Sequence, residues 1–577
     1  MATHNLNGLW RFTIDQDPEY HEPGQYAGPV SLRYWDTVPV PGCWNKYADK
    51  YDLYEGIGWF VREFTLEQLP ARPVALLRFG GVNYLANVFL NGKHLGAHEG
   101  GYTPFLIDAS TAIKTGKNWL AVRVDNRHLK TRLPAVIGWY NYGGIHRDVT
   151  LTVTSQAQLT VVSVTATPEG KTAKGLVRVT STAMDHPARL RVTIVDASGR
   201  PVWKGTASGA GTWELPFSFP KAQCWAPGHP YLYQCRVELS GGRNVLDERS
   251  CKFGVRKIKV MGNRILHNGK PLYLKGMCYL YDHPVSGLRF DPEVVRRDLD
   301  DLQALGINCL RSHFPPPDSF LDECDRRGIM LWMEVPIYCV APPSATTPSV
   351  FADDSFCNLA TSMLKEMVEQ AMNHPSVIIW SVGNECNADH PEARGFFIAC
   401  VEQVRALDST RLISYASLYG ALGCVADLAD VISVNQYWGW YDKLDYIGAH
   451  PAGQPVKLPL VIPELEACLK EKSALGKPVL LSEFGADAVP GYFSASRELW
   501  SENYQALIFR RTLEIASKYP AVQGTFPFLY QDYRDPSKPR TQYWQGLNLK
   551  GVVDYHRRHK LAWDEVQKIY KGKSNAR

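Results

Sequence analysis

The first 255 residues alternate apolar and polar positions in short runs, a pattern typical of half-buried β-strands. Turn-forming residues separate the runs, and Asn91-Gly92 between two of them is a strong hairpin signal. We predict two β-sandwiches, over residues 1–155 and 156–255, which divide near Ser155. The runs behind this prediction are Trp59–Phe64, Ala86–Leu90, Trp119–Val124 and Val149–Val153, then Leu190–Val195 and Tyr233–Leu239.

From residue 256 onward, continuous apolar runs alternate with amphipathic stretches, which predicts parallel strands joined by crossover helices. Eight such units in about 320 residues predict a closed (β/α)₈ barrel over 256–577. A doubly wound open sheet is the alternative, but no glycine-rich phosphate loop follows the first run. The expected strands are Leu272–Tyr279, Ile307–Ser312, Ile329–Val335, Val377–Ser381, Leu412–Ala416, Val431–Gln436, Val479–Ser482 and Val522–Phe528, and the expected helices include Pro292–Leu305, Asn358–Met372, Ala393–Leu407 and Ala562–Tyr570.

Two of these apolar runs lead into a glutamate: Glu385 after the fourth strand and Glu483 after the seventh. A carboxylate at the mouth of a core strand is costly unless it is satisfied or used. In a barrel, chemistry takes place at the carboxyl ends of the strands, where both glutamates fall. Such a pair, one acid protonated because the other raises its pKa, cleaves glycosidic bonds. The structural alternative for each glutamate alone is a salt-bridged acid at a strand end.

Composition narrows the class of protein. Apolar content of 45% and charged content of 21% are ordinary for a soluble globular chain. The net charge of +5 over 577 residues gives no reason to expect nucleic acid or an anionic membrane as partner. Thirteen cysteines without a C-x-x-C pair argue against a disulfide framework and a structural zinc site. No apolar run reaches the roughly 18 residues of a membrane span, so we expect a reduced, cytoplasmic protein.

Five segments stand in order along nearly the whole chain: Asn141–Arg147, Leu310–Pro315, Trp380–Glu385, Asn435–Tyr437 and Ser482–Ala486. Together they resemble the motifs of glycoside hydrolase family 2, in which Trp380–Glu385 looks like the acid/base motif and Ser482–Ala486 like the nucleophile motif. Asn141–Arg147 resembles the signature of its N-terminal sandwich, Leu310–Pro315 its second-strand segment and Asn435–Tyr437 its sixth-strand segment. The resemblance implies a jelly-roll sandwich, an immunoglobulin-like sandwich and then a TIM barrel. It also implies a homo-oligomer, a dimer or a tetramer.

The resemblance assigns roles to residues at the barrel mouth. Glu385 would be the general acid/base and Glu483 the nucleophile. Asn384 would bond the sugar 2-hydroxyl, and Tyr437 would donate to the nucleophile. Arg311 would pair with the nucleophile and His313 would line the sugar subsite, unless both belong to a structural network. Of the other acids, Glu334 is expected to matter, whereas Asp487 and Asp532 are expected to be structural.

The sugar is expected to be a β-D-glucuronide removed from a chain end with retention of configuration. Asn548-Leu549-Lys550 resembles the Asn-x-Lys element with which the family's glucuronidases bind the uronate carboxylate, and a lysine point charge suits that group. The resemblance further implies substrate contacts from Trp438 and Tyr441 in the sixth-strand loop and from Asp282 after the first strand. The two-carboxylate mechanism requires no cofactor and no metal, although magnesium is used by some galactosidase-type relatives.

Departures from the family pattern keep other sugars open. Gly138 stands where glucuronidases usually place an aspartate, Leu280 and Tyr281 replace a His and a Glu, and the eighth strand carries Phe528 without the usual tryptophan. A β-galacturonide, a β-galactoside or an arabinoside are therefore alternative substrates. A non-enzymatic alternative is a carbohydrate-binding protein that has lost catalysis.

Overall fold

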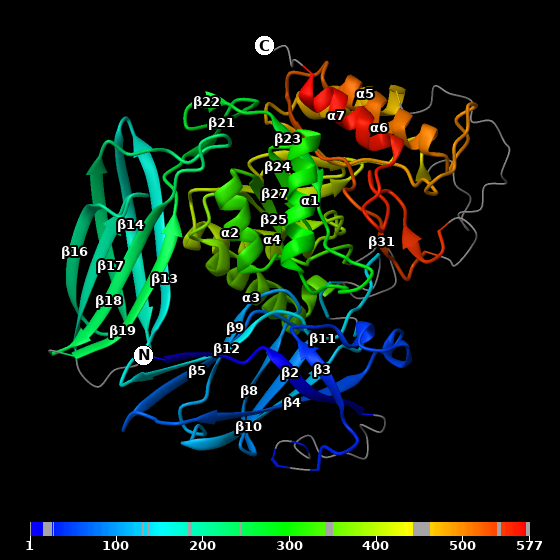
Figure 1. The fold of residues 1–577 in the computed structure, drawn as a ribbon. Coiled ribbons are helices and arrows are strands. Elements are labelled where there is room, and N and C mark those ends of the chain that lie inside the picture. The colour runs from blue at the N-terminus through cyan, green and yellow to red at the C-terminus, as the bar shows by residue number, and fades with distance from the viewer. Residues whose placement is uncertain are drawn as a thin grey trace.

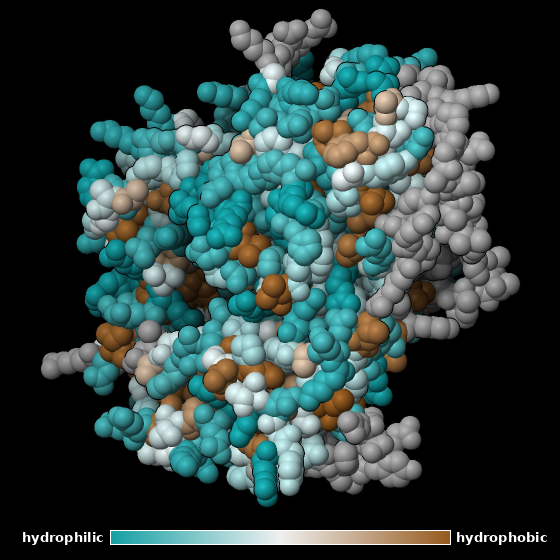
Figure 2. All heavy atoms as spheres, turned by 45° about the vertical axis from the view of Figure 1, so that its right-hand side comes forward, coloured by the Kyte–Doolittle hydropathy of each residue, from teal (hydrophilic) through white to brown (hydrophobic). Residues whose placement is uncertain are grey.

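The computed structural model describes residues 2–15, 26, 28–29, 31–129, 132–134, 138–182, 187–242, 244–340, 350–441, 462–538 and 544–572. These residues form two β-sandwiches followed by a closed barrel, which confirms the predicted fold class (Figure 1). None of the described helices is long and apolar enough to cross a membrane. On the face in Figure 2, hydrophobic residues form small scattered patches within a mainly hydrophilic surface.

The first sandwich pairs a four-stranded sheet, β1-β12-β5-β9, with a six-stranded sheet, β3-β2-β4-β10-β7-β8, and adds the short pair β6-β11. Leu90 pairs with Lys93, so Asn91-Gly92 forms the predicted two-residue turn with both residues at positive φ. The elements are β1 (Ala2–Asn5), β2 (Gly8–Asp15), β3 (Asp36–Val40), η1 (Trp44–Lys46), η2 (Asp49–Tyr51), β4 (Ile57–Leu66), β5 (Pro73–Phe79), β6 (Val82–Asn83), β7 (Leu85–Leu90), β8 (Lys93–Glu99), β9 (Phe105–Asp108), β10 (Gly116–Asp125), β11 (Gly144–Ile145) and β12 (Val149–Ser155).

The second sandwich packs a three-stranded sheet, β13-β14-β17, on a four-stranded sheet, β16-β15-β18-β19. Alternate side chains of β17 are buried and exposed along its whole length, as expected for a sheet with one face in the core. The strands are β13 (Leu159–Glu169), β14 (Thr172–Ser181), β15 (Ala188–Val195), β16 (Pro201–Gly209), β17 (Thr212–Pro220), β18 (Tyr233–Gly241) and β19 (Asn244–Phe253), and the small sheet β20 (Ile258–Met261), β21 (Arg264–His267) and β22 (Lys270–Pro271) follows.

The barrel contains all eight predicted strands in sequence order, and its crossover helices surround it. The strands are β23 (Leu274–Cys278), β24 (Cys309–Ser312), β25 (Met330–Glu334), β26 (Val377–Asn384), β27 (Leu412–Leu418), β28 (Ile432–Asn435), β29 (Val479–Glu483) and β30 (Val522–Thr525). The helices are α1 (Pro292–Leu305), α2 (Asp318–Arg327), η3 (Val350–Ala352), α3 (Asp354–Ala371), α4 (Ala393–Leu407), η4 (Gly423–Val425), α5 (Ile462–Ser473), α6 (Glu502–Ala516) and α7 (Leu561–Lys571), and the pair β31 (Tyr533–Arg534) and β32 (Leu547–Asn548) follows β30.

Helix α1 shows how local sequence sets an element's limits. The Asp291 side chain accepts hydrogen bonds from the backbone N–H groups of Glu293 and Val294, and Pro292 occupies the first helical position. Gly306 ends the helix in the left-handed conformation with φ of 101°. Helix α3 begins at Asp354, four residues before the predicted start, because Asp353 caps it in the same way.

The two sandwiches contact different sides of the barrel: in Figure 1 the first lies below it and the second to its left. Arg534, after the last barrel strand, pairs with Asp52 of the first sandwich at 2.7 Å, at the carboxyl ends of the strands. At the other end, the Asn373 amide just before β26 bonds Val162 and Val164 of the second sandwich. The first sandwich is therefore the one that borders the barrel mouth.

Candidate active site

Glu385 and Glu483 both lie at the carboxyl end of the barrel. Glu483 is the last residue of β29, and Glu385 follows β26 directly with φ of 52°. Because strands β26 and β29 are three apart in a closed eight-stranded barrel, their ends face one another across its mouth. The glutamates are thus on the only end of the barrel where parallel strands place catalytic groups together.

The Glu483 carboxylate is held by two donors. Arg311 Nη1 donates to Oε1 at 2.7 Å, and Tyr437 Oη donates to Oε2 at 2.6 Å. Burial, and next the Glu483 charge, raises the pKa of Tyr437 well above its usual value, so its phenol keeps the proton that it donates. Nε2 of His313 lies 3.3 Å from Oε1. A buried carboxylate with a guanidinium and a phenol on its two oxygens has both oxygens satisfied and is fixed in direction.

Glu385 has the opposite surroundings. Its Oε1 accepts a hydrogen bond from Asn435 Nδ2 at 2.7 Å, and the Cys339 thiol lies 3.7 Å from its Oε2. Burial, and then the charge of Glu483, raises the pKa of Glu385 to about 7. Glu385 therefore holds a proton near neutral pH, while the oxygens of Glu483 accept from a guanidinium and a phenol, and acid-assisted nucleophilic displacement needs such a division of roles.

Arg311 is the centre of a buried charge network. Besides Glu483, its guanidinium bonds both oxygens of Glu334 at 3.1 and 3.0 Å and the side-chain oxygen of Asn384 at 2.7 Å. Glu334 also accepts from Ser381 and shares a hydrogen bond with His313 Nδ1 at 2.9 Å. Burial opposes ionisation of Glu334, but Arg311 and His313 outweigh it and lower its pKa. Glu334 thus balances the charge of Arg311 and orients His313.

Asn384 is oriented by its oxygen, which accepts from both Arg311 and Asn435. Its Nδ2 has no hydrogen-bond partner among the described residues. Because an amide has two donors on that nitrogen, the side chain keeps N–H groups available beside Glu385 for a ligand hydroxyl.

Lys550, Asn548 and Tyr441 gather on the Tyr437 side of the mouth. Lys550 Nζ lies 2.7 Å from Asp487 Oδ2 and 2.7 Å from Tyr441 Oη. Asn548 accepts from the backbone N–H of Lys550, and the Tyr441 and Tyr437 rings are 5.1 Å apart. The structure therefore brings these three residues to the side of Tyr437, the residue that bonds Glu483.

Trp438 and Asp282 lie apart from this cluster. The Trp438 ring contacts that of Tyr419, with centroids 5.2 Å apart, at the rim beyond β27 and β28. The Asp282 carboxylate accepts from the Tyr142 and Tyr555 hydroxyls and from the Arg534 N–H. Asp282 thus lines a cavity between the first sandwich and the barrel, and its recorded bonds join the two domains instead of reaching either catalytic glutamate.

Sequence reasoning assigned no role to Asn435, Trp139 or Phe528. Asn435 belongs to the Asn435–Tyr437 segment at the end of the sixth strand, and its place at a strand end could have indicated a role in the site. Trp139 comes from the first sandwich, and its ring centroid lies 5.3 Å from that of His313. The Phe528 ring centroid lies 5.8 Å from the same His313 centroid. A side chain added at Gly138 would meet the Tyr338 hydroxyl at 3.0 Å, so an aspartate there would require that hydroxyl to move.

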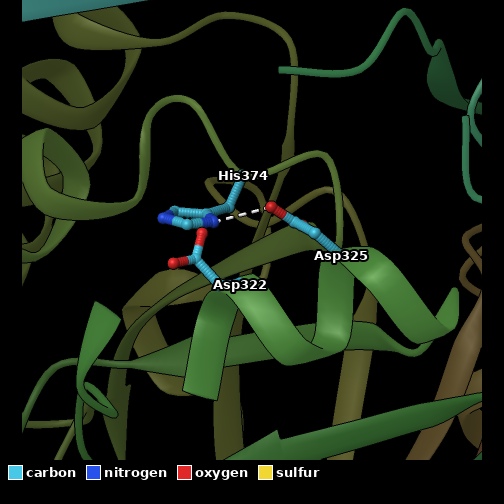
Figure 3. Close-up of side chains that lie close together, drawn as sticks. All are labelled: Asp322, Asp325 and His374. Carbon is cyan, nitrogen blue, oxygen red and sulfur yellow. Dashed lines mark hydrogen bonds and ion pairs between the residues drawn. The ribbon is translucent and has the colours of Figure 1, made fainter. Parts of the chain in front are cut away.

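Asp322, Asp325 and His374 form the cluster among the described residues whose ligand atoms lie close enough to hold a metal ion (Figure 3). His374 precedes β26, so the cluster is at the opposite end of the barrel from Glu385. His374 Nδ1 already bonds Asp325 at 2.7 Å, and the other Asp325 oxygen accepts from the Ser376 N–H. These bonds make an ion pair between side chains, apart from the catalytic chemistry.

Comparisons with known proteins cover the whole chain. The model described as "Glycosyl hydrolases family 2, TIM barrel domain" matches residues 258–574, the family's sugar binding domain matches 3–155, and a further family 2 model matches 149–256. A β-glucuronidase of Paenibacillus borealis is 28% identical over 596 residues, which cover 97% of this chain and 95% of the relative.

Many solved structures are similar to this chain, and two of them illustrate the similarity over nearly the full length. A family 2 β-galacturonidase from Eisenbergiella tayi, bound to galacturonate, has a TM-score of 0.84 and 28% identity, covering 99% of this chain and 97% of that one. A Bifidobacterium dentium β-glucuronidase complexed with coumarin-3-O-glucuronide has a TM-score of 0.88 and 25% identity, with the same coverage.

Proposed function

Since the chain belongs to glycoside hydrolase family 2, we propose that it removes terminal β-D-glucuronic acid from small glycosides or oligosaccharide ends with retention of configuration. The observation that carries the proposal is the contrast between the two glutamates. Glu483 accepts hydrogen bonds from Arg311 and Tyr437 on its two oxygens, whereas the pKa of Glu385 is raised to about 7.

The proposed reaction has two displacements. Glu483 attacks the anomeric carbon while Glu385 gives its proton to the glycosidic oxygen, so the aglycone leaves and an ester joins the sugar to Glu483. As that ester forms, the Glu483 charge disappears, and the pKa of Glu385 falls because that charge helped to raise it. Glu385 then takes a proton from water, which attacks the anomeric carbon and frees Glu483.

The proposed uronate specificity is supported by the buried ammonium of Lys550 beside Asn548 and Tyr441. An ammonium has three donors, so besides its bonds to Asp487 and Tyr441 Lys550 has a third N–H to give to a uronate carboxylate, the kind of acceptor that a neutral hexose lacks. The relatives named above include enzymes that act on glucuronides, and their similarity extends along nearly the whole chain.

A β-galacturonide is the second candidate because the Eisenbergiella tayi galacturonidase is as similar to this chain as the glucuronidases are. The two sugars differ only in the configuration at C4, and Gly138 replaces an aspartate that the family's glucuronidases usually place against the sugar. Nitrophenyl β-glycosides of glucuronate, galacturonate, galactose and arabinose would decide between them. Preference for either neutral sugar would contradict the uronide proposal.

We further propose that the protein acts in the cytoplasm as a homo-oligomer. All thirteen cysteines are free thiols, which suits a reducing compartment. Leu9, Tyr34 and Leu53 expose large apolar side chains on the first sandwich, and a second copy could cover them. Light scattering on the purified protein would contradict the assembly if the mass is that of one chain.

A further inference from the structure

Lys550 is a fully compensated cation. Its ammonium lies 2.7 Å from Asp487, and both side chains have no exposed surface. The other Asp487 oxygen accepts from the Leu549 N–H, so the carboxylate is fixed in place. Lys550 and Asp487 together carry no net charge. A substrate carboxylate brought against this pair alone would bury a negative charge without a balancing positive one, which is costly.

A second ammonium lies next to the pair. Lys538 follows β31, is partly buried, and places Nζ 3.5 Å from Tyr441 Oη. The same Tyr441 oxygen accepts from Lys550 at 2.7 Å, so one phenol joins the two lysines. Among the described residues, no carboxylate oxygen lies within 4.0 Å of Lys538 Nζ; its recorded neighbours are the rings of Tyr441 and Trp544, with centroids at 5.3 and 5.0 Å.

We propose that Lys538 is a specificity-determining residue: it supplies the net positive charge of the uronate subsite, and Tyr441 couples it to Lys550. This inference rests on the proposed uronide function. Lys538, Lys550 and Asp487 together carry one positive charge, which the negative charge of a uronate would balance. The nearby Asp535 carboxylate accepts instead from the N–H and the hydroxyl of Ser537. The Tyr441 ring contacts Tyr437, whose hydroxyl bonds the nucleophile at 2.6 Å, so the lysines border the same subsite.

The rival explanation is structural, since an ammonium over two aromatic rings can stabilise the turn without meeting substrate. Paired substrates separate the two roles. Nitrophenyl β-D-glucuronide and its methyl ester have the same sugar ring and hydroxyl groups, but the ester carries a methyl group where the glucuronide carries a negative charge. If Lys538 is structural, its replacement should change kcat/KM equally for both substrates. If Lys538 balances the substrate's charge, its replacement should lower kcat/KM for the glucuronide alone.

The variant Lys538→Met tests the proposal in the full-length enzyme. We expect kcat/KM on the glucuronide to fall about tenfold, mostly through KM, while kcat/KM on the methyl ester changes less than about twofold. Lys538→Arg keeps the charge and should retain most of the activity. Added salt should raise KM for the glucuronide less in Lys538→Met than in the wild type, because one of the screened cations is gone.

The matched control is Lys568→Met on α7, which removes the same charge from an exposed lysine paired with Glu565. It should leave both substrates unchanged. Equal losses on glucuronide and ester, or no loss on either, would overturn the role of Lys538 while leaving the uronide function standing. A wild-type enzyme that prefers the ester or neutral glycosides would overturn the uronide function itself, and this inference with it.

Discussion

Asn435 joins the acid to the nucleophile's network. Its Nδ2 donates to Glu385 Oε1 at 2.7 Å and to Asn384 Oδ1 at 2.9 Å, and that same Asn384 oxygen accepts from Arg311. Arg311 in turn bonds Glu483. One continuous set of hydrogen bonds therefore fixes the positions of the two catalytic carboxyl groups relative to each other.

The variant Asn435→Ala removes the donor that stabilises ionised Glu385. Because this hydrogen bond lowers the pKa of Glu385, its loss should raise that pKa, and the alkaline limb of the kcat/KM profile should move to higher pH. The acid is also less well oriented, so we expect kcat to fall roughly ten- to hundredfold. A pH–rate profile measures both effects.

Ser482→Ala is the graded control for that variant. Ser482 donates to Asn435 Oδ1 at 2.7 Å, so its removal loosens Asn435 without removing the bond to Glu385. Its effect on kcat should be smaller than that of Asn435→Ala, and the alkaline limb should hardly move. An alkaline limb that shifts to lower pH in Asn435→Ala would contradict the assigned hydrogen bond.

The wild-type kcat/KM should decline as pH rises through about 7, since Glu385 must be protonated to act as an acid and its pKa is raised to about 7. Glu385→Gln has no proton to give, so it should lose this limb. It should be impaired most on glycosides with basic leaving groups and least on dinitrophenyl glycosides, whose aglycone leaves unaided. Equal impairment on both leaving-group classes would count against the acid role.

The variant Glu483→Gln should lower kcat by several orders of magnitude, because no carboxylate remains to form the ester. It should also lower the pKa of Glu385, since the Glu483 charge is a cause of its elevation. That pKa should stay above its ordinary value of 4.5, because burial is the larger cause. Carbon-13 NMR titration of labelled glutamate reports it, and an unchanged value would mean that the two groups do not interact.

The Lys550–Asp487 pair complicates any test of Lys550 by deletion. Lys550→Ala would leave the Asp487 carboxylate buried without its partner, which typically destabilises a protein by roughly 3–5 kcal/mol. We expect a marked fall in melting temperature along with lost activity on glucuronides. An activity assay alone would then not distinguish unfolding from loss of substrate binding.

The double variant Lys550→Met with Asp487→Leu removes both charges and should recover most of the melting temperature while glucuronide activity stays low. Calorimetry and kinetics on the same samples separate the two quantities. If the double variant recovers glucuronide turnover as well as stability, Lys550 has no part in substrate recognition.

Much of the barrel was predictable because its strands are buried on both faces and read as continuous apolar runs. The α1 boundaries were predictable because every determinant, from Asp291 to Gly306, is local. Glu385 and Glu483 were identifiable because each is a charge at the end of such a run. Their placement depends only on strand order, which the run spacing reveals.

The family resemblance predicted the contacts of Arg311 and Tyr437 with Glu483, but other contacts between distant segments could not be predicted. Asp487 lies 63 positions before Lys550 along the chain, and nothing local marks it as the lysine's partner. Trp139 reaches His313 across a domain boundary, and aromatic residues are too common in cores for this one to be singled out. Glu334 was expected to matter, but its bonds to Arg311 and His313 required the closed barrel.

The His374–Asp325 pair gives a stability prediction that does not involve catalysis. Burial alone would lower the pKa of His374. The negative charges of Asp325, Asp322 and Asp318 together outweigh burial, so the pKa of His374 is raised. Figure 3 shows His374 beside Asp325 and Asp322. A histidine whose pKa is higher in the folded state stabilises the fold fully below its unfolded pKa of about 6.5. That contribution is lost as pH rises through the folded pKa.

Wild-type free energy of unfolding should therefore fall more between pH 6 and pH 8 than that of His374→Gln, by about 1.4 kcal/mol for each unit by which the pKa is raised. Denaturant unfolding followed by tryptophan fluorescence measures it, and Trp225, which bonds the Asp325 carbonyl, is one of the sixteen tryptophans that contribute to the signal. Asp322→Asn should shrink the pH dependence only in part, since Asp325 remains. If Mn²⁺ or Zn²⁺ stabilises the wild type but not Asp322→Asn, and EDTA reverses the effect, the cluster is a metal site and the ion-pair explanation is wrong.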